Sequence, residues 1–140
     1  MGRILGIDYG RRRCGVAATD ELRIVASPVA TVPSAQLLDF IRRYISENKV
    51  DVIVVGKPTT LRGEDSESMR YIRPFLGRLR QMLPEGIQVR LYDERFTSAL
   101  AHQAMIDGGL GRMARRDKAT VDRTAATIIL NDYLQSVYNT

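Results

Sequence analysis

The nearly unbroken apolar run Val50–Gly56 restricts the fold of this chain more than any other segment. A β-branched run of this kind is typical of a central strand in a parallel sheet, because both of its faces must be covered. A helical pattern precedes it: Ser34 can act as the N-cap, and the apolar residues that follow to about Asn48 are three or four positions apart. We therefore expect a strand, helix, strand crossover unit.

The rest of the chain supplies further strands and helices. Three strands are expected before the crossover helix, the first two forming a hairpin and the third lying at an edge because it contains Pro28: Arg3–Asp8, Cys14–Thr19 and Ile24–Val32. The later segments are a helix around Met69–Leu83 that Pro74 should kink or divide, a half-exposed strand at Ile87–Tyr92, a short helix from Thr97 or Ser98 to Ile106, a basic loop at 107–118, and a helix over Thr120–Val137. This order predicts an α/β fold, a mixed five-stranded sheet (three antiparallel strands, then crossover strands) with helices on both faces.

Composition limits the classes of protein to which the chain can belong. Its 140 residues are 44% hydrophobic, which suits a single domain spanning 1–140 with a proper core. The formal net charge of +5 is compatible with a polyanionic partner. No apolar run is long enough to span a membrane, no signal peptide is recognisable, and Cys14 is the only cysteine, so we expect a cytoplasmic protein in which Cys14 is a small buried side chain.

Three acidic residues follow the ends of predicted elements. Asp8 ends the first strand, Glu94 follows the last strand, and Asp122 begins the apolar stripe of the final helix. Sites in crossover folds gather beyond the carboxyl ends of parallel strands, so these carboxylates are expected at one rim of the sheet. Asp93 is an alternative to Glu94, because the sequence does not fix where the strand ends. Singly, each acid can also have a structural role, as a turn cap, a surface ion pair or a helix-dipole partner.

Converging carboxylates repel one another unless a cation neutralises them. Oxygen ligands suit Mg²⁺ or Mn²⁺, and a pair of such ions is suited to phosphodiester hydrolysis. We therefore hypothesise a metal-dependent nuclease whose catalytic and metal-binding residues are Asp8, Glu94 and Asp122.

Basic residues near these acids suit a phosphate backbone. Arg11 and Arg13 are more simply explained as solvated surface residues, and the single histidine, His102, as a surface residue. The candidate nucleic-acid contacts are Arg12, Lys57, Arg95, Arg112, Arg115, Arg116 and Lys118.

Five motifs in this order resemble the YqgF family of ribonuclease H-like proteins, also called RuvX, and the resemblance covers essentially the whole chain. They are Gly6–Gly10 with Arg12 and Gly15–Ala17, Thr19–Asp20, Val55–Pro58, Asp93–Ser98, and Val121–Asp122 with Ala125–Ala126. The resemblance implies a ribonuclease H-like fold in which Asp8, Glu94 and Asp122 match the acidic motif positions. It also implies a cytoplasmic bacterial nuclease that takes part in maturation of the 5′ end of pre-16S ribosomal RNA. Holliday junction resolution is the older inference for the family.

The chain departs from the family pattern at Cys14, Lys57 and Arg123, and Gly56–Pro58 lacks the acid that more distant junction resolvases carry there. Expected partners are structured RNA, branched DNA or ribosomal precursor particles, with a monomer or a homodimer both open. The alternatives are a junction-resolving endonuclease and a non-catalytic protein that binds nucleic acid or assists ribosome assembly. An ATPase of the actin and sugar-kinase type is excluded, because 140 residues cannot form its two domains.

Overall fold

The computed structural model describes residues 2–57, 69–93 and 118–138, and within the last range the side chains of residues 124–137. The strands are β1 (Arg3–Asp8), β2 (Arg13–Thr19), β3 (Ala26–Pro33), β4 (Val50–Lys57) and β5 (Gln88–Asp93). A short 3₁₀ turn, η1 (Ser34–Gln36), leads into the first helix, and the helices are α1 (Leu37–Glu47), α2 (Met69–Met82) and α5 (Lys118–Tyr138).

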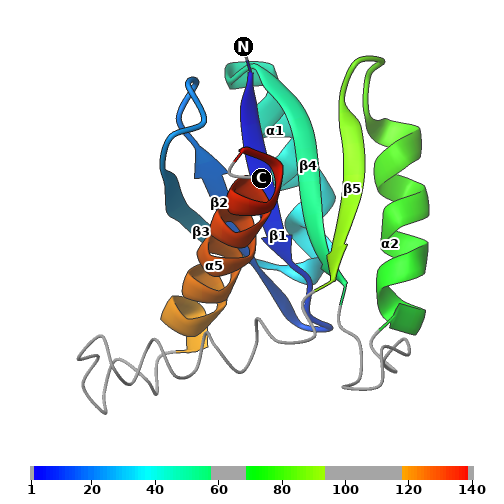
Figure 1. The fold of residues 1–140 in the computed structure, drawn as a ribbon. Coiled ribbons are helices and arrows are strands. Elements are labelled where there is room, and N and C mark those ends of the chain that lie inside the picture. Colours follow the sequence, from blue (N-terminus) through cyan, green and yellow to red (C-terminus); the bar gives the residue numbers. More distant parts are fainter. Residues whose placement is uncertain (1, 58–68, 94–117, 139–140) are drawn as a thin grey trace.

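The five strands form one mixed sheet in the order β3-β2-β1-β4-β5. The pairs β1–β2 and β2–β3 are antiparallel, whereas β4 is parallel to both β1 and β5. The predicted hairpin, the edge position of the third strand and the central parallel strand are therefore confirmed. The carboxyl ends of β1, β4 and β5 lie at the same end of the molecule (Figure 1).

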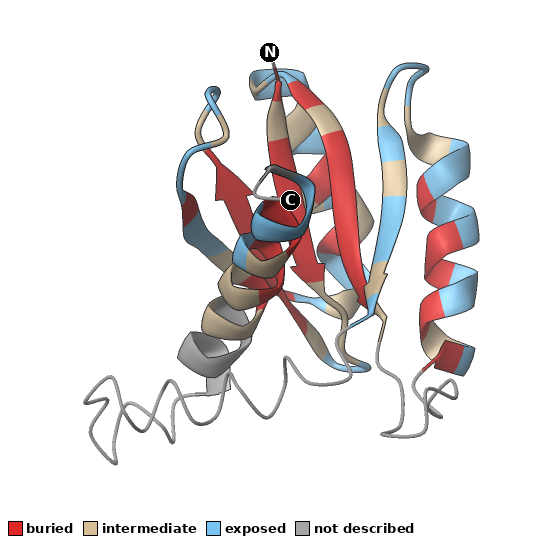
Figure 2. Ribbon diagram, in the orientation of Figure 1, coloured by how far each residue is buried: buried red, intermediate tan, exposed pale blue. Residues whose placement is uncertain are grey.

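Helices cover both faces of the sheet, as predicted. On one face, which we call the α1/α2 face, Leu5 and Ile7 of β1 pack with α1 and α2. On the opposite α5 face, Ile4 packs with Ala126 and Leu130 of α5. Alternating side chains of β1 thus enter two separate cores. Burial is greatest in the three inner strands β1, β2 and β4 and is lower in the edge strands β3 and β5 (Figure 2).

The predicted N-cap is wrong. Ser34 begins η1 instead of capping α1, whose N-cap residue is Gln36 with no side-chain hydrogen bond. The Ser34 hydroxyl donates to the carbonyl oxygen of Gly10 at 2.5 Å, and its amide donates to the carbonyl oxygen of Arg12 at 2.9 Å. Ser34 therefore ties the β3–α1 connection to the β1–β2 turn.

The start of the third strand and the continuity of the second helix also differ from the predictions. The third strand begins at Ala26, because the Asp20 carboxylate accepts the amides of Ile24 and Val25 at 2.8 Å each and holds both residues in the β2–β3 turn. Pro74 does not divide α2, which runs without a break from Met69 to Met82. Pro74 is at its sixth position, so the helix continues past it without the hydrogen bond that an amide there would donate to the carbonyl oxygen of Arg70.

Candidate active site

Asp8 is the last residue of β1 and lies on the α5 face of the sheet. Its neighbours at alternate positions, Ile4 and Gly6, both contact α5, whereas Leu5 and Ile7 enter the other core. Asp8 is half-buried and pairs in register with Gly15 of β2. The predicted alternation along the first strand is confirmed, and it brings one carboxylate to the rim beneath α5.

Gly6 sets how closely α5 approaches this strand. A Cβ atom at Gly6 would lie 2.9 Å from the Cβ atom of Leu130 and 3.2 Å from the carbonyl oxygen of Ala126. Only hydrogen fits there, so the helix rests almost directly on the β1 backbone. The amino end of α5 lies toward the carboxyl end of β1 (Figure 1), and Asp122 is one helical turn before Ala126.

The last strand places Asp93 on the face opposite Asp8. Val89 packs against the core of the α1/α2 face, while Tyr92 packs against the α5 core, where its ring meets Tyr133 edge-on at a centroid distance of 6.2 Å. Burial raises the pKa of Tyr92, and Asp132 and Asp93 raise it further. Because side chains alternate, Asp93 projects to the α1/α2 face.

Lys57 follows the apolar run Val50–Gly56 directly; it is the last residue of β4 and pairs in register with Asp93. Val52 and Val54 belong to the α5 core, and Ile53 and Val55 belong to the other core. By alternation Lys57 therefore projects to the α1/α2 face, away from Asp8, and Gly56 lies on the α5 face in register with Tyr92. Gly56 is buried and contributes no side chain to this face.

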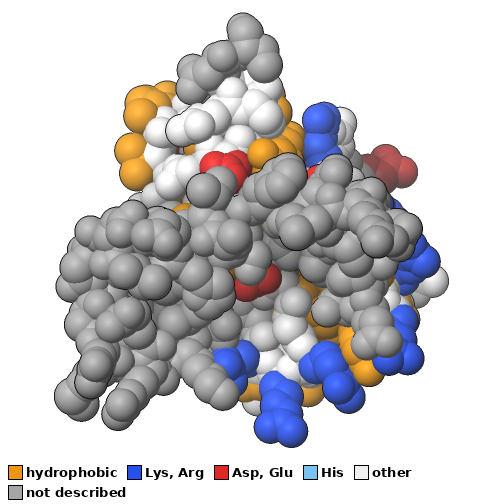
Figure 3. Space-filling model, turned by 60° about the horizontal axis from the view of Figure 1, so that its bottom comes forward, with side chains coloured by type: hydrophobic (Ala, Val, Ile, Leu, Met, Phe, Trp, Pro, Cys, Tyr) orange, Lys and Arg blue, Asp and Glu red, His pale blue; other side chains and the backbone are white. Residues whose placement is uncertain are grey.

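The arginines of the β1–β2 turn differ in their surroundings. Arg12 is exposed, as its proposed role requires. Arg11 is exposed too, but its guanidinium lies 4.5 Å from the ring centroid of Tyr71 in α2, so it is more than the solvated surface residue that was expected. Lys and Arg side chains gather along the margin of the face that carries the strand ends (Figure 3).

Aromatic and thiol contacts that sequence reasoning missed support the same turn. Tyr9 stacks on Phe75 of α2 with ring centroids 4.7 Å apart, and burial raises its pKa. Cys14 is fully buried, as predicted, and its Sγ atom lies 3.3 Å from the Ser34 Oγ atom. The apolar residue Tyr9 immediately after Asp8 was a usable signal for the packing, whereas the contact with Ser34 depends on tertiary structure.

Several predicted residues lie outside the part of the chain that the structure describes. Asp122 and Lys118 are within α5, but their side chains are among those not described. Within the described residues, no three His, Cys, Asp or Glu side chains are grouped so that they could hold a metal ion. The predicted residues in undescribed segments are Glu94, Arg95, His102, Arg112, Arg115 and Arg116, together with the short helix at 97–106 and the basic loop.

Comparison with known sequences gives one consistent result. A family model described as RuvX, Holliday junction resolvase, matches residues 2–136. Proteins curated as "Putative pre-16S rRNA nuclease" are 54% identical in Phocaeicola vulgatus and 50% identical in Porphyromonas gingivalis, each over 136 residues and 97% of this chain. The match covers 97% and 98% of those proteins, so the similarity extends over their whole length.

Solved structures support the fold. The Fowlpox virus resolvase, in complex with Holliday junction DNA, gives a TM-score of 0.60 at 14% identity, covering 97% of this chain and 99% of that one. Thermus thermophilus RuvC in complex with a Holliday junction substrate gives 0.54 at 17% identity, covering 98% and 96%. At these identities the likeness concerns architecture: the mixed sheet is that of the ribonuclease H-like resolvases.

Proposed function

The chain belongs to the RuvX family, and from that membership we propose that it is a metal-dependent nuclease that hydrolyses phosphodiester bonds in the 5′-end maturation of pre-16S ribosomal RNA. The observation that carries the proposal is the position of Asp8 on the α5 face at the end of β1. Because Gly6 has no side chain, the backbone of α5 lies close to the backbone of β1 next to Asp8. A carboxylate in that position can meet acids brought by α5 and by the chain leaving β5.

The proposed partners of Asp8 are Glu94 and Asp122. Tyr92 lies on the α5 face and Asp93 on the other, so continued strand alternation would turn residue 94 toward Asp8. Alternation thus favours Glu94 over Asp93. Gly6 of β1 contacts Ala126 of α5. Asp8 is two residues after Gly6 on the same face of β1, and Asp122 is one helical turn before Ala126, so both acids lie on the same side of this contact.

The donor set fits a hard divalent cation. Asp8, Glu94 and Asp122 would supply carboxylate oxygens, the ligands that Mg²⁺ and Mn²⁺ prefer. When bound, such ions lower the pKa of water and stabilise the leaving oxygen of phosphoryl transfer. The chain's own residues hold the acids in place: Gly6 fixes the distance of α5, and Tyr92 packs on Tyr133 below the rim.

Basic side chains around this rim would hold the RNA backbone. Arg12 is exposed in the turn that follows Asp8, and Lys57 is at the end of β4 on the other face, so they would contact separate stretches of RNA. The remaining proposed contacts come after β5 and at the start of α5: Arg95, Arg112, Arg115, Arg116 and Lys118. Such contacts position the RNA and leave sequence choice to other features.

Structured RNA, presented on a ribosomal precursor particle, is the proposed substrate, and the cytoplasm the proposed location. No helix in the described ranges is both long enough and apolar enough to cross a membrane. A junction-resolving endonuclease is the second candidate, favoured by the family description and by the fold of the resolvases. Resolution of a four-way junction would require a symmetric dimer.

The test incubates the protein with labelled pre-16S RNA, single-stranded RNA and a four-way DNA junction, with Mg²⁺, Mn²⁺ or chelator. Asp8→Asn, Glu94→Gln and Asp122→Asn should each lower cleavage of the RNA by about 100-fold or more, because each removes a charged ligand. Cleavage that persists in Asp8→Asn would contradict the proposed site. Cleavage of the junction alone would favour the second candidate.

Asp93→Asn is the matched control. It makes the same change in charge one residue from Glu94, but on the opposite face of β5, so cleavage should remain within a few-fold of wild type. Equal losses in Asp93→Asn and Glu94→Gln would mean that strand alternation does not select the ligand. RNA binding without metal-dependent cleavage would indicate a non-catalytic role in ribosome assembly.

A further inference from the structure

The two edges of the sheet are built differently. The edge strand β3 contains Pro28 and Pro33, and its pairing with β2 shifts between Val16 and Ala17. Prolines and irregular pairing prevent another strand from adding to an edge. The other edge strand, β5, has six residues in regular register with β4 and contains no proline. Among the described residues, no strand pairs with its outer side.

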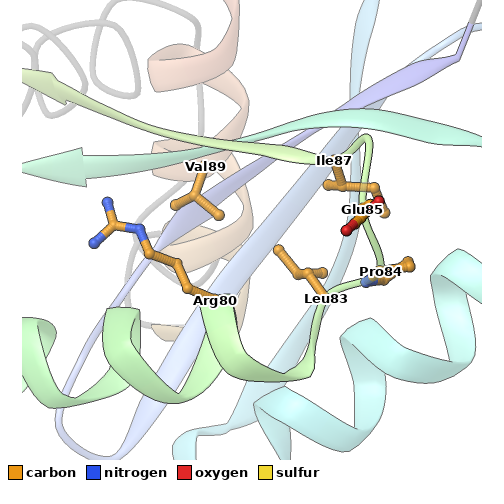
Figure 4. Close-up of a pocket in the computed structure, with 6 residues that line it drawn as sticks. All are labelled: Arg80, Leu83, Pro84, Glu85, Ile87 and Val89. Carbon is orange, nitrogen blue, oxygen red and sulfur yellow. The ribbon is translucent and has the colours of Figure 1, made fainter.

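A cavity of about 350 Å³ lies beside this open edge, between β5 and the end of α2. The side chains of Leu83, Ile87 and Val89 converge on it, and Arg80 extends from α2 toward Val89 (Figure 4). Glu85 and Pro84 complete the lining. The cavity is at the start of β5, at the end of the strand away from Asp93, so it is separate from the proposed nuclease site.

The side of α2 next to the cavity is basic. Arg73, Gly77 and Arg80 are four and three residues apart, so they follow one another along one side of the helix, and all three are exposed. We call these three residues the α2 strip. An added Cβ at Gly77 would meet no atom within 4 Å, so the strip is open at its centre.

We infer that the β5 edge and its cavity bind an extended acidic peptide segment of another protein, added as a sixth strand. The backbone of the peptide would pair with the outer edge of β5. Alternate side chains would point to the α1/α2 face, where one aliphatic side chain would enter the cavity and its acidic neighbours on the same face would meet the α2 strip. The β5 edge matches the backbone of such a peptide, the cavity matches its aliphatic side chain, and the α2 strip matches its acidic side chains.

Two other occupants fit less well. A nucleic-acid strand carries a phosphate at every nucleotide and would meet the Glu85 carboxylate, whereas a peptide can place a neutral residue there. A second copy of this chain paired through β5 would bring two α2 strips together across the two-fold axis, and like charges would oppose that pairing.

The test measures binding of a fluorescein-labelled, capped eight-residue peptide by fluorescence anisotropy. Every second position of the peptide carries glutamate or, once, valine, so that both kinds of side chain reach the α1/α2 face, and threonine fills the positions between them. We expect saturable binding that is about tenfold weaker, or more, when lysine replaces glutamate. N-methylation of alternate peptide amides should abolish binding, because it removes the donors that strand pairing requires. Equal binding of the acidic and basic peptides, or of the methylated peptide, would overturn the inference.

Variants of α2 give the second readout. Gly77→Glu should weaken the acidic peptide by about tenfold while keeping or raising the melting temperature, because it removes a glycine from a helix at an open position. Arg80→Glu should weaken binding similarly. Arg43→Glu, the same reversal at an exposed arginine on α1, is the matched control and should leave binding unchanged.

Two outcomes would assign the surface elsewhere and overturn the inference. One is that a 12-nucleotide oligouridylate binds, that Gly77→Glu weakens this binding, and that no peptide binds. The other is a dimer in sedimentation experiments that Gly77→Glu dissociates. Nuclease activity is measured in parallel: unchanged activity in Gly77→Glu keeps failure of this inference distinguishable from failure of the proposed nuclease site.

Discussion

Gly6 is the residue at which the stability of the fold and the proposed site depend on the same contact. With no side chain, it lets Ala126 and Leu130 of α5 rest on β1, and the helix carrying Asp122 approaches the strand carrying Asp8. A glycine in a strand interior usually weakens the strand, so its presence here is explained by the close approach of another backbone. Gly10 has a comparable role in the turn, where a Cβ atom would collide with the carbonyl oxygen of Arg13.

Gly6→Ala should destabilise the protein by about 1–3 kcal/mol, because the new methyl group overpacks a contact that includes helix backbone. It should also lower nuclease activity, since α5 must move outward with Asp122. Urea unfolding and the cleavage assay measure the two effects. Gly77→Ala, where space is open, should instead stabilise by about 0.5–1 kcal/mol. A neutral Gly6→Ala would mean that α5 is not held at this contact.

At the level of elements, the strongly patterned segments were predictable and the context-dependent boundaries were not. The β-branched run of β4 and the helical spacing in α1 depend on local sequence, so both elements were predicted correctly. Ile24 and Val25 look like strand residues, but the Asp20 carboxylate binds their amides and fixes a turn. Ser34 looks like an N-cap, but Gly10, distant in sequence, accepts its hydroxyl. For the site, the position of Asp8 at the end of the first strand was predicted correctly, whereas β4 extends one residue beyond the apolar run Val50–Gly56 and includes Lys57.

Ser34→Ala should reduce the free energy of unfolding by about 0.5–1.5 kcal/mol, because the carbonyl oxygen of Gly10 loses a donor between two connections of the fold. Chemical denaturation measures the loss. Ser46→Ala is a suitable control: it also removes a serine bond to a backbone carbonyl, that of Arg43, but at an exposed site, and its effect should be smaller. Similar losses for the two variants would show that Ser34 does not connect β3 to the turn in an energetically significant way.

For the molecule as a whole, the sheet order places the proposed chemistry and the proposed peptide site at different ends of β5. The carboxyl ends of β1 and β4 converge near the end of β5, while the cavity lies at its beginning. The protein could therefore hold a protein partner and an RNA substrate together. Its net charge of +5 favours association with RNA over a long range, because the whole distribution of charge contributes to the field around it.

Binding of pre-16S RNA should fall by about 50-fold between 50 and 200 mM salt if about four phosphates are contacted along single-stranded RNA. Filter binding over a salt series gives the slope of log affinity against log salt concentration. Arg12→Ala should make that slope shallower by about 0.7, because one phosphate contact is lost. Affinity that is independent of salt would contradict binding through the basic residues proposed here.

The contact between Gly6 and α5 also affects the timing of folding during synthesis. The strand carrying Asp8 leaves the ribosome early, and α5 is the last described element to follow. Until α5 has emerged, the β1 surface beneath it stays uncovered and Asp122 cannot approach Asp8. If Asp8 and Asp122 act together as proposed, a nascent chain that lacks α5 also lacks one of the proposed ligands and should not cleave RNA.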